Sequence, residues 1–75
     1  MSAVYKFRAR IAKTGEPIKV EIVLGGVSRG FTSDRKDDWM VVELSTSGHY
    51  SWYAKYYGNT IDSGESSGGT IDILY

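Results

Sequence analysis

The sequence predicts an all-β fold, namely a small antiparallel β-sandwich or partly open barrel of six or seven strands. Apolar and polar residues alternate with a period of two along most of the 75 residues, as they do in half-buried strands. Nine glycines and a single proline fall mostly at turn-like positions, and no segment keeps a helical period over the length of an ordinary helix. A chain this short forms one domain, here residues 1–75.

The first two strands are predicted near the N-terminus. In residues 4–11, aromatic and aliphatic side chains occupy every second position and basic side chains most of the positions between them. Residues 14–17 have the composition of a turn, and residues 18–24 then alternate again. Two alternating segments joined by a short turn predict an antiparallel hairpin.

The middle of the chain predicts two further strands. Residues 27–33 are weakly patterned and indicate a short edge strand. Residues 39–44 predict a firmer strand, and the continuous apolar run at residues 39–42 is typical of a strand covered on both faces at that point. Between them, residues 34–40 are the only helical candidate, of one to two turns, with Ser33 as its N-cap.

The most aromatic segment, residues 49–57, predicts the next strand. Gly58-Asn59 follows as a two-residue hairpin signal, because both residues tolerate positive φ. A short strand at residues 60–63, a flexible loop at residues 64–69 and a last strand at residues 70–74 complete the chain.

This order of aromatic strand, Gly-Asn turn, short strand, Ser/Gly-rich loop and final strand covers residues 50–73. It resembles the C-terminal half of small immunoglobulin-like β-sandwich domains, in particular the soluble part of the small mycobacterial membrane accessory proteins. The resemblance implies the architecture alone. The chain shows no membrane anchor and no cysteine pair, it is shorter than the usual sandwich of about 100 residues, and no functional motif matches.

The inward-facing apolar positions predict the hydrophobic core. These positions are Phe7, Ile11, Val20, Ile22, Leu24, Val42, Leu44, Trp52, Ala54, Ile61, Ile71 and Ile73.

Charge and hydropathy narrow the classes of partner. Nine Lys+Arg balance nine Asp+Glu, whereas a domain that depends on phosphate contacts usually carries a basic excess. No apolar run is long enough for a membrane span, and the N-terminal residues lack a signal-peptide pattern. We therefore expect a cytoplasmic protein with no membrane span, although a processed secreted domain would have the same composition.

The sequence contains no catalytic or metal-binding constellation. The single histidine, His49, stands beside a turn glycine, and there is no cysteine. The aspartates of residues 34–38 are interrupted by two basic residues and lack the glycine pivot of a calcium loop. The serines lie in glycine-rich turns without a nucleophile elbow. We expect a protein that is not an enzyme and uses no cofactor or metal.

The aromatic excess indicates a binding role. Six tyrosines and two tryptophans exceed what so small a core can bury, and such residues anchor protein interfaces. Tyr53, Lys55 and Tyr57 share the predicted outer face of the aromatic strand. We expect this face, with the edge near residues 29–31, to bind a protein partner or a second copy of the chain.

Single-stranded nucleic acid is the alternative partner. Lys6, Arg8 and Arg10 form the outward row of the first strand, and they would hold phosphates while bases stack on the tyrosines. The dependence of binding on salt distinguishes a nucleic-acid partner from a protein partner. Phosphate contacts weaken steeply as ionic strength rises, whereas an apolar protein contact changes little. The simplest interpretation is that the outward tyrosines and the outward basic residues have a purely structural role. Tyrosine favours strands, and basic residues protect exposed strands from aggregation.

Overall fold

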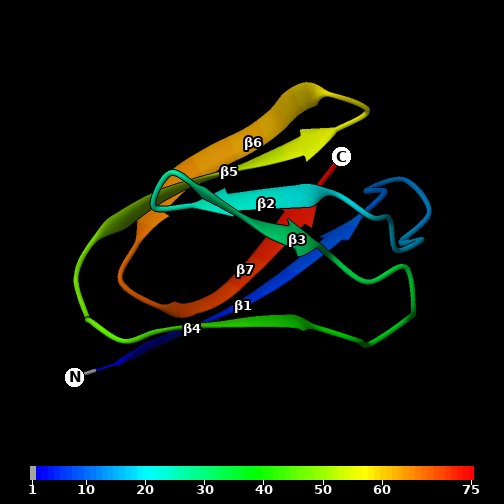
Figure 1. Ribbon diagram of the computed structural model, residues 1–75. Helices are drawn as coiled ribbons and strands as arrows, with labels where there is room; N and C mark the ends of the chain where they lie inside the picture. Colours follow the sequence, from blue (N-terminus) through cyan, green and yellow to red (C-terminus); the bar gives the residue numbers. More distant parts are fainter. Residues whose placement is uncertain (1) are drawn as a thin grey trace.

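The computed structural model describes residues 2–75, and this part of the chain contains seven strands and no helix (Figure 1). The strands are β1 (Ala3–Arg10), β2 (Glu21–Leu24), β3 (Val27–Phe31), β4 (Met40–Leu44), β5 (Tyr50–Tyr56), β6 (Asn59–Ser66) and β7 (Gly69–Leu74). The predicted all-β class is confirmed, and the strands form two sheets that do not close into a barrel.

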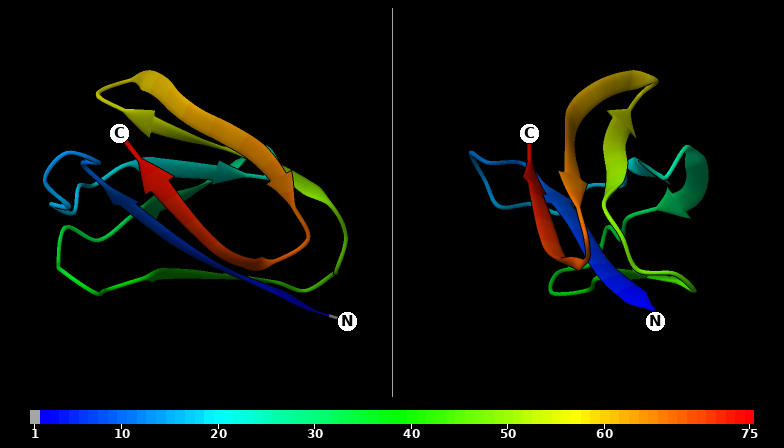
Figure 2. Two further views of the ribbon diagram at one scale, coloured as in Figure 1. Left: turned by 180° about the vertical axis from the view of Figure 1, so that it is seen from behind. Right: turned by 90° about the vertical axis from the view of Figure 1, so that its left-hand side faces the viewer.

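The two sheets are called sheet A and sheet B below. Sheet A has the order β4-β1-β7, with β1 antiparallel to β4 and parallel to β7. Sheet B has the order β3-β2-β5-β6, and all of its neighbouring strands are antiparallel. Seen from the side in Figure 2 (right), β7 and β5 lie in separate layers. The border strands are therefore β4 and β7 in sheet A, and β3 and β6 in sheet B.

The core lies between the sheets and centres on the inner face of β1. Tyr5, Phe7 and Ala9 are fully excluded from solvent. The Phe7 ring stacks beside that of Tyr5 at 6.1 Å and meets Trp52 of sheet B edge to face at 5.9 Å. Of the predicted core, Ile61 and Ile71 are partly buried against this cluster, Ile11 lies outside it at intermediate burial, and the other residues are buried in it.

The predicted hairpin of the first two strands is wrong. β2 pairs with β3 and β5 in sheet B, and an isolated bridge between Arg10 and Pro17 is what remains of the expected pairing. The N–H groups of Ile11 and Ile18 form the two hydrogen bonds of that bridge, and from Phe7 back to Ala3 the strand β1 pairs with β4 instead. A period of two marks the face that is buried. It does not tell whether the next strand lies beside this one or packs across the core.

Two local predictions are also wrong. Residues 34–40 form turns and the start of β4, with no helix. The expected loop at residues 64–69 is mostly strand, because β6 continues to Ser66 and β7 begins at Gly69. Gly64 pairs with Trp52, and a Cβ on it would lie 3.2 Å from the indole ring, so this glycine leaves room for a core side chain.

The Tyr5 hydroxyl ties the two sheets together. It donates a hydrogen bond of 2.7 Å to the backbone oxygen of Ser66 at the end of β6. Burial raises the pKa of Tyr5, so the neutral donor persists at physiological pH.

Replacing Tyr5 with Phe removes this hydrogen bond and keeps the ring. We expect the free energy of unfolding to fall by about 1 kcal/mol, measured by urea denaturation. Tyr53→Phe is the matched control, because Tyr53 is on the exposed face of β5, and it should change stability by less than about 0.5 kcal/mol. Equal effects of the two substitutions would contradict the role given to the Tyr5 hydroxyl.

Candidate functional site

The predicted binding residues lie on the outer faces of two different sheets. Lys6, Arg8 and Arg10 alternate with buried residues of β1 and so project from sheet A. Tyr53 and Lys55 alternate with buried residues of β5 and project from sheet B. Because the core lies between the sheets, the two sets face in opposite directions, and no single face joins them.

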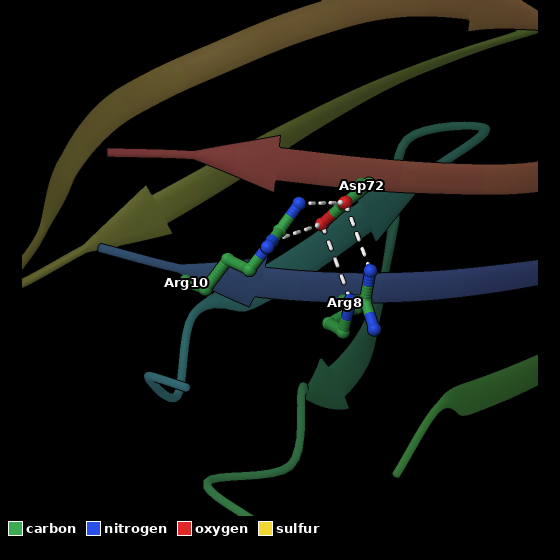
Figure 3. A network of polar contacts seen from close by, with 3 residues as sticks. All are labelled: Arg8, Arg10 and Asp72. Carbon is green, nitrogen blue, oxygen red and sulfur yellow. Dashed lines mark hydrogen bonds and ion pairs between the residues drawn. The ribbon is translucent and has the colours of Figure 1, made fainter. Parts of the chain in front are cut away.

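Asp72 of β7 holds two of the three basic residues (Figure 3). Arg8 donates to the two carboxylate oxygens at 3.3 and 3.0 Å, and Arg10 donates to the same oxygens at 3.3 and 2.8 Å. The hydrogen bond from Arg8, followed by the one from Arg10, lowers the pKa of Asp72. The Arg8 guanidinium also lies 4.1 Å from the centre of the Trp39 ring, as in a cation–π pair. Within the described chain, Lys6 is the member of this row that forms no ion pair.

The second set borders an open groove of about 570 Å³ at one end of sheet B. Lys55 and Tyr57 both line this groove. Tyr53 lies two residues earlier on the same face, paired with Val23 of β2. The complete lining is Ile18, Lys19, Glu21, Phe31, Asp34, Lys55, Tyr56, Tyr57 and Gly58.

Thr32 fixes the wall of the groove that comes from the segment before β2. Its Oγ1 accepts a hydrogen bond from Val20 N at 3.0 Å and donates one to Ile18 O at 2.9 Å, while its own N–H donates to Val20 O at 2.9 Å. The residue is buried, so water does not compete for these bonds. These three hydrogen bonds, called the Thr32 clamp below, extend the β2–β3 pairing by one residue beyond Phe31, which is opposite Glu21 in the register.

Tyr57 occupies the tip of the β5–β6 hairpin in a conformation that rarely suits tyrosine. Its φ is 49° and that of Gly58 is 80°, both positive as a type I′ turn requires. The hairpin predicted at Gly58-Asn59 is confirmed, but its turn residues are Tyr57 and Gly58, since Tyr56 pairs with Asn59. Left-handed backbone at a residue other than glycine stores about 1 kcal/mol or more and often marks a functional site.

The turn also directs the Tyr57 side chain into solvent. The residue is 89% exposed, and Phe31, which also lines the groove, is 62% exposed. The Tyr57 ring rests against Tyr56 at 4.6 Å, and Tyr56 meets Tyr75 edge to face at 5.1 Å. Two large aromatic side chains, Phe31 and Tyr57, are thus exposed to solvent while lining the same groove.

The charges of the groove cancel. Lys19 and Lys55 are matched by Glu21 and Asp34. Within residues 2–75, no group of three or more histidine, cysteine or acidic residues is arranged to hold a metal ion. The arrangement suits an apolar or aromatic side chain between Phe31 and Tyr57, with polar groups around it.

Sequence reasoning missed several residues of the groove. Lys55 and Tyr57 are predicted site residues, and Phe31 lies in the predicted edge. Lys19 and Glu21 are not predicted, and Asp34 is predicted only as part of a charged turn. No sequence signal identifies these three as neighbours of Tyr57, because that requires knowing that β2 lies between β3 and β5.

Comparison of the chain with protein-family models, curated protein sequences and solved structures finds no match. The resemblance to immunoglobulin-like domains therefore stays a prediction. No helix among residues 2–75 is long and apolar enough to cross a membrane.

Replacing Tyr57 with Asn relieves the strain at the hairpin tip, because asparagine tolerates left-handed backbone. We expect the free energy of unfolding to rise by about 0.5–1 kcal/mol in urea denaturation. Tyr57→Val is the control, since a β-branched residue tolerates this conformation worst and should be destabilising. A destabilised Tyr57→Asn variant would show that the turn is not strained.

The ion pairs of Asp72 predict a dependence of stability on pH. Because the folded-state pKa of Asp72 lies below its unfolded value, its contribution is complete above about pH 4 and is lost as the pH falls through the lowered folded value. Asp72→Asn should reduce the free energy of unfolding by about 0.5–1 kcal/mol at neutral pH, and this difference should shrink below about pH 4. Urea denaturation of both proteins over this range provides the check; a difference that stayed constant would contradict it.

Proposed function

We propose that this domain is a non-enzymatic interaction module that binds a protein partner through the outer face of sheet B, at the groove between Phe31 and Tyr57. The observation that carries the proposal is the pair of exposed aromatic side chains, one of them at a strained turn. In the isolated domain the turn at Tyr57 costs free energy, and the two exposed rings gain none from burial. A partner that covers the two rings offsets that cost.

The chemistry of the groove favours a polypeptide as the ligand. Tyrosine and phenylalanine bury a large area with little loss of conformational entropy, and such residues act as interface anchors. The balanced charges around them fit a partner segment that carries both an acidic and a basic group beside an apolar side chain. The Thr32 clamp holds one wall in place before binding, which reduces the entropy lost on association.

The finer architectural assignment, an immunoglobulin-like sandwich, belongs to this proposal. Facing sheets of three and four strands support it, because constant-type immunoglobulin domains divide their seven strands in the same way. The place of β1, between β4 and β7 and not beside β2, departs from that scheme.

Single-stranded nucleic acid remains the alternative ligand, and the geometry supports it less. A strand bound to Tyr53, Lys55 and Tyr57 would not reach Lys6, Arg8 and Arg10 on the opposite face. The groove itself has no basic excess with which to neutralise phosphates.

Truncating the two exposed tyrosines tests the proposal. The wild-type domain and the Tyr53→Ser/Tyr57→Ser variant are used in parallel to capture proteins from an extract of the source organism, and a protein retained by the wild type alone is purified. Calorimetric titration should show its affinity for the variant reduced by about 100-fold, because two anchor residues are lost.

Leu74→Ser provides the matched control, because Leu74 is an exposed apolar residue on β7 in the other sheet. Its affinity for the purified partner should stay within about twofold of wild type. A partner that binds the tyrosine variant and the wild type equally would refute the assignment of this face.

An amide NMR titration with a single-stranded oligonucleotide of about twelve nucleotides tests the alternative. At low salt we expect no shifts at residues 53–57. Shifts at residues 6–10 and 53–57 that disappear at moderate salt would replace the protein proposal with nucleic-acid binding.

A further inference from the structure

The border strand β4 is a regular edge whose one charged residue is Glu43. It keeps an uninterrupted register with β1 from Met40 to Leu44 and contains no glycine, proline or basic residue. In sheet A, β1 is the one neighbour of β4. Figure 1 shows β4 in the lower part of the molecule, where the N-terminal end of β1 reaches lower still. The outward backbone N–H and C=O groups of β4 are therefore open to pairing with another strand.

The other three border strands carry features that discourage such pairing. β3 contains a bulge at Arg29, which its register with β2 skips, and it has Gly30 at a φ of 107°. The Arg29 side chain also donates to the backbone oxygen of Leu24. β6 carries two acidic residues, and Asp62 Oδ1 accepts the N–H of Ser63. β7 starts at a positive-φ glycine and carries Asp72 on its outer face. Bulges, glycines and charges are the devices that natural edge strands use against pairing.

An apolar surface adjoins the β4 edge. Val41 on β4 is 59% exposed, and Val4 on the neighbouring β1 is 41% exposed. Trp39, just before β4, is half-buried against Arg8. This edge lies in sheet A, away from the groove on the outer face of sheet B.

We propose that β4 pairs antiparallel with β4 of a second copy of this chain, about a two-fold axis at Val42. The two three-stranded sheets then join into one of six strands. In this register Met40 is opposite Leu44 and Val41 is opposite Glu43 of the second copy. Inward and outward residues stay on their own faces, because the period of two is preserved.

The charged residues on the outer face of sheet A are complementary to those of a second copy. Lys6 is the neighbour of Val41 in the β1–β4 register, and Glu43 is the neighbour of Val4. In the paired sheet, Lys6 is two strand spacings, roughly 10 Å, from Glu43 of the second copy, and long side chains can approach each other across that gap. The same contact occurs twice about the axis. A net charge of zero means that the two copies do not repel each other overall.

Sedimentation equilibrium tests the pairing. A single short strand buries less than a standard interface, so we expect a weak dimer with a dissociation constant on the order of 100 µM. The wild-type mass should rise from 8.3 kDa towards twice that value as concentration increases. Val41→Lys should raise the dissociation constant by at least about tenfold, because lysine on an edge strand opposes pairing.

Val27→Lys is the matched control, since Val27 is an exposed valine (52%, against 59% for Val41) on β3, a border strand of sheet B. It should dimerise like the wild type, and thermal melts should show that both variants are folded. A wild type that stays monomeric up to about 1 mM overturns the proposal. A dimer that is lost in Val27→Lys and kept in Val41→Lys also overturns it.

A charge exchange tests the register. Lys6→Glu and Glu43→Lys should each weaken the dimer, and the double variant should recover most of the wild-type affinity. In a mixture of labelled and unlabelled protein, intermolecular NMR contacts should join the Val41 methyl groups to Glu43. Contacts between other strands, or a double variant weaker than both single ones, would rule out this arrangement.

Discussion

The packing of β1 onto sheet B is the contact on which the rest of the structure depends. Tyr5, Phe7 and Ala9 are fully buried, and Phe7 meets Trp52 across the core. Burying each aromatic ring stabilises the fold by roughly 2 kcal/mol, which is a large share of the stability of so small a domain. Once this face of β1 is buried, the alternation of the strand directs its basic row outward from sheet A. The same constraint on β5 directs the tyrosines outward from sheet B, so the core itself separates the basic face from the aromatic face.

The two outer surfaces use their exposed groups differently. On sheet A, Asp72 and Trp39 contact the arginines within the chain, and the exposed apolar residues are the two valines beside the β4 edge and Leu74 of β7. On sheet B, Phe31 and Tyr57 stay uncovered around a groove whose wall is fixed by the Thr32 clamp. A dimer formed through β4 would leave both grooves free, so one assembly would present two copies of the same binding face.

Local pattern was sufficient to predict the fold class, most strand positions, the β5–β6 hairpin and most of the core. It was not sufficient for pairing: the alternation of residues 18–24 fits a strand beside β1 as well as one across the core, and the second arrangement is the true one. Gly64 belongs to a glycine-rich segment that predicts a loop, yet it lies in β6. Glycine occurs in this strand because the Trp52 ring occupies the space that a side chain would need. Lys55 and Tyr57 were predictable from the outward face of their strand. The groove around them was not, because it joins three segments that meet only through strand order.

Site-specific photo-crosslinking from the two outer faces tests the central claim most directly. A photoreactive phenylalanine analogue is placed at position 31, in the groove of sheet B, or at position 74, on the exposed face of β7. Each variant is irradiated in an extract of the source organism. The account predicts one discrete protein adduct from position 31, competed by excess unmodified domain, and none from position 74. Adducts from position 74 alone, or nucleic acid in place of protein at position 31, would contradict it.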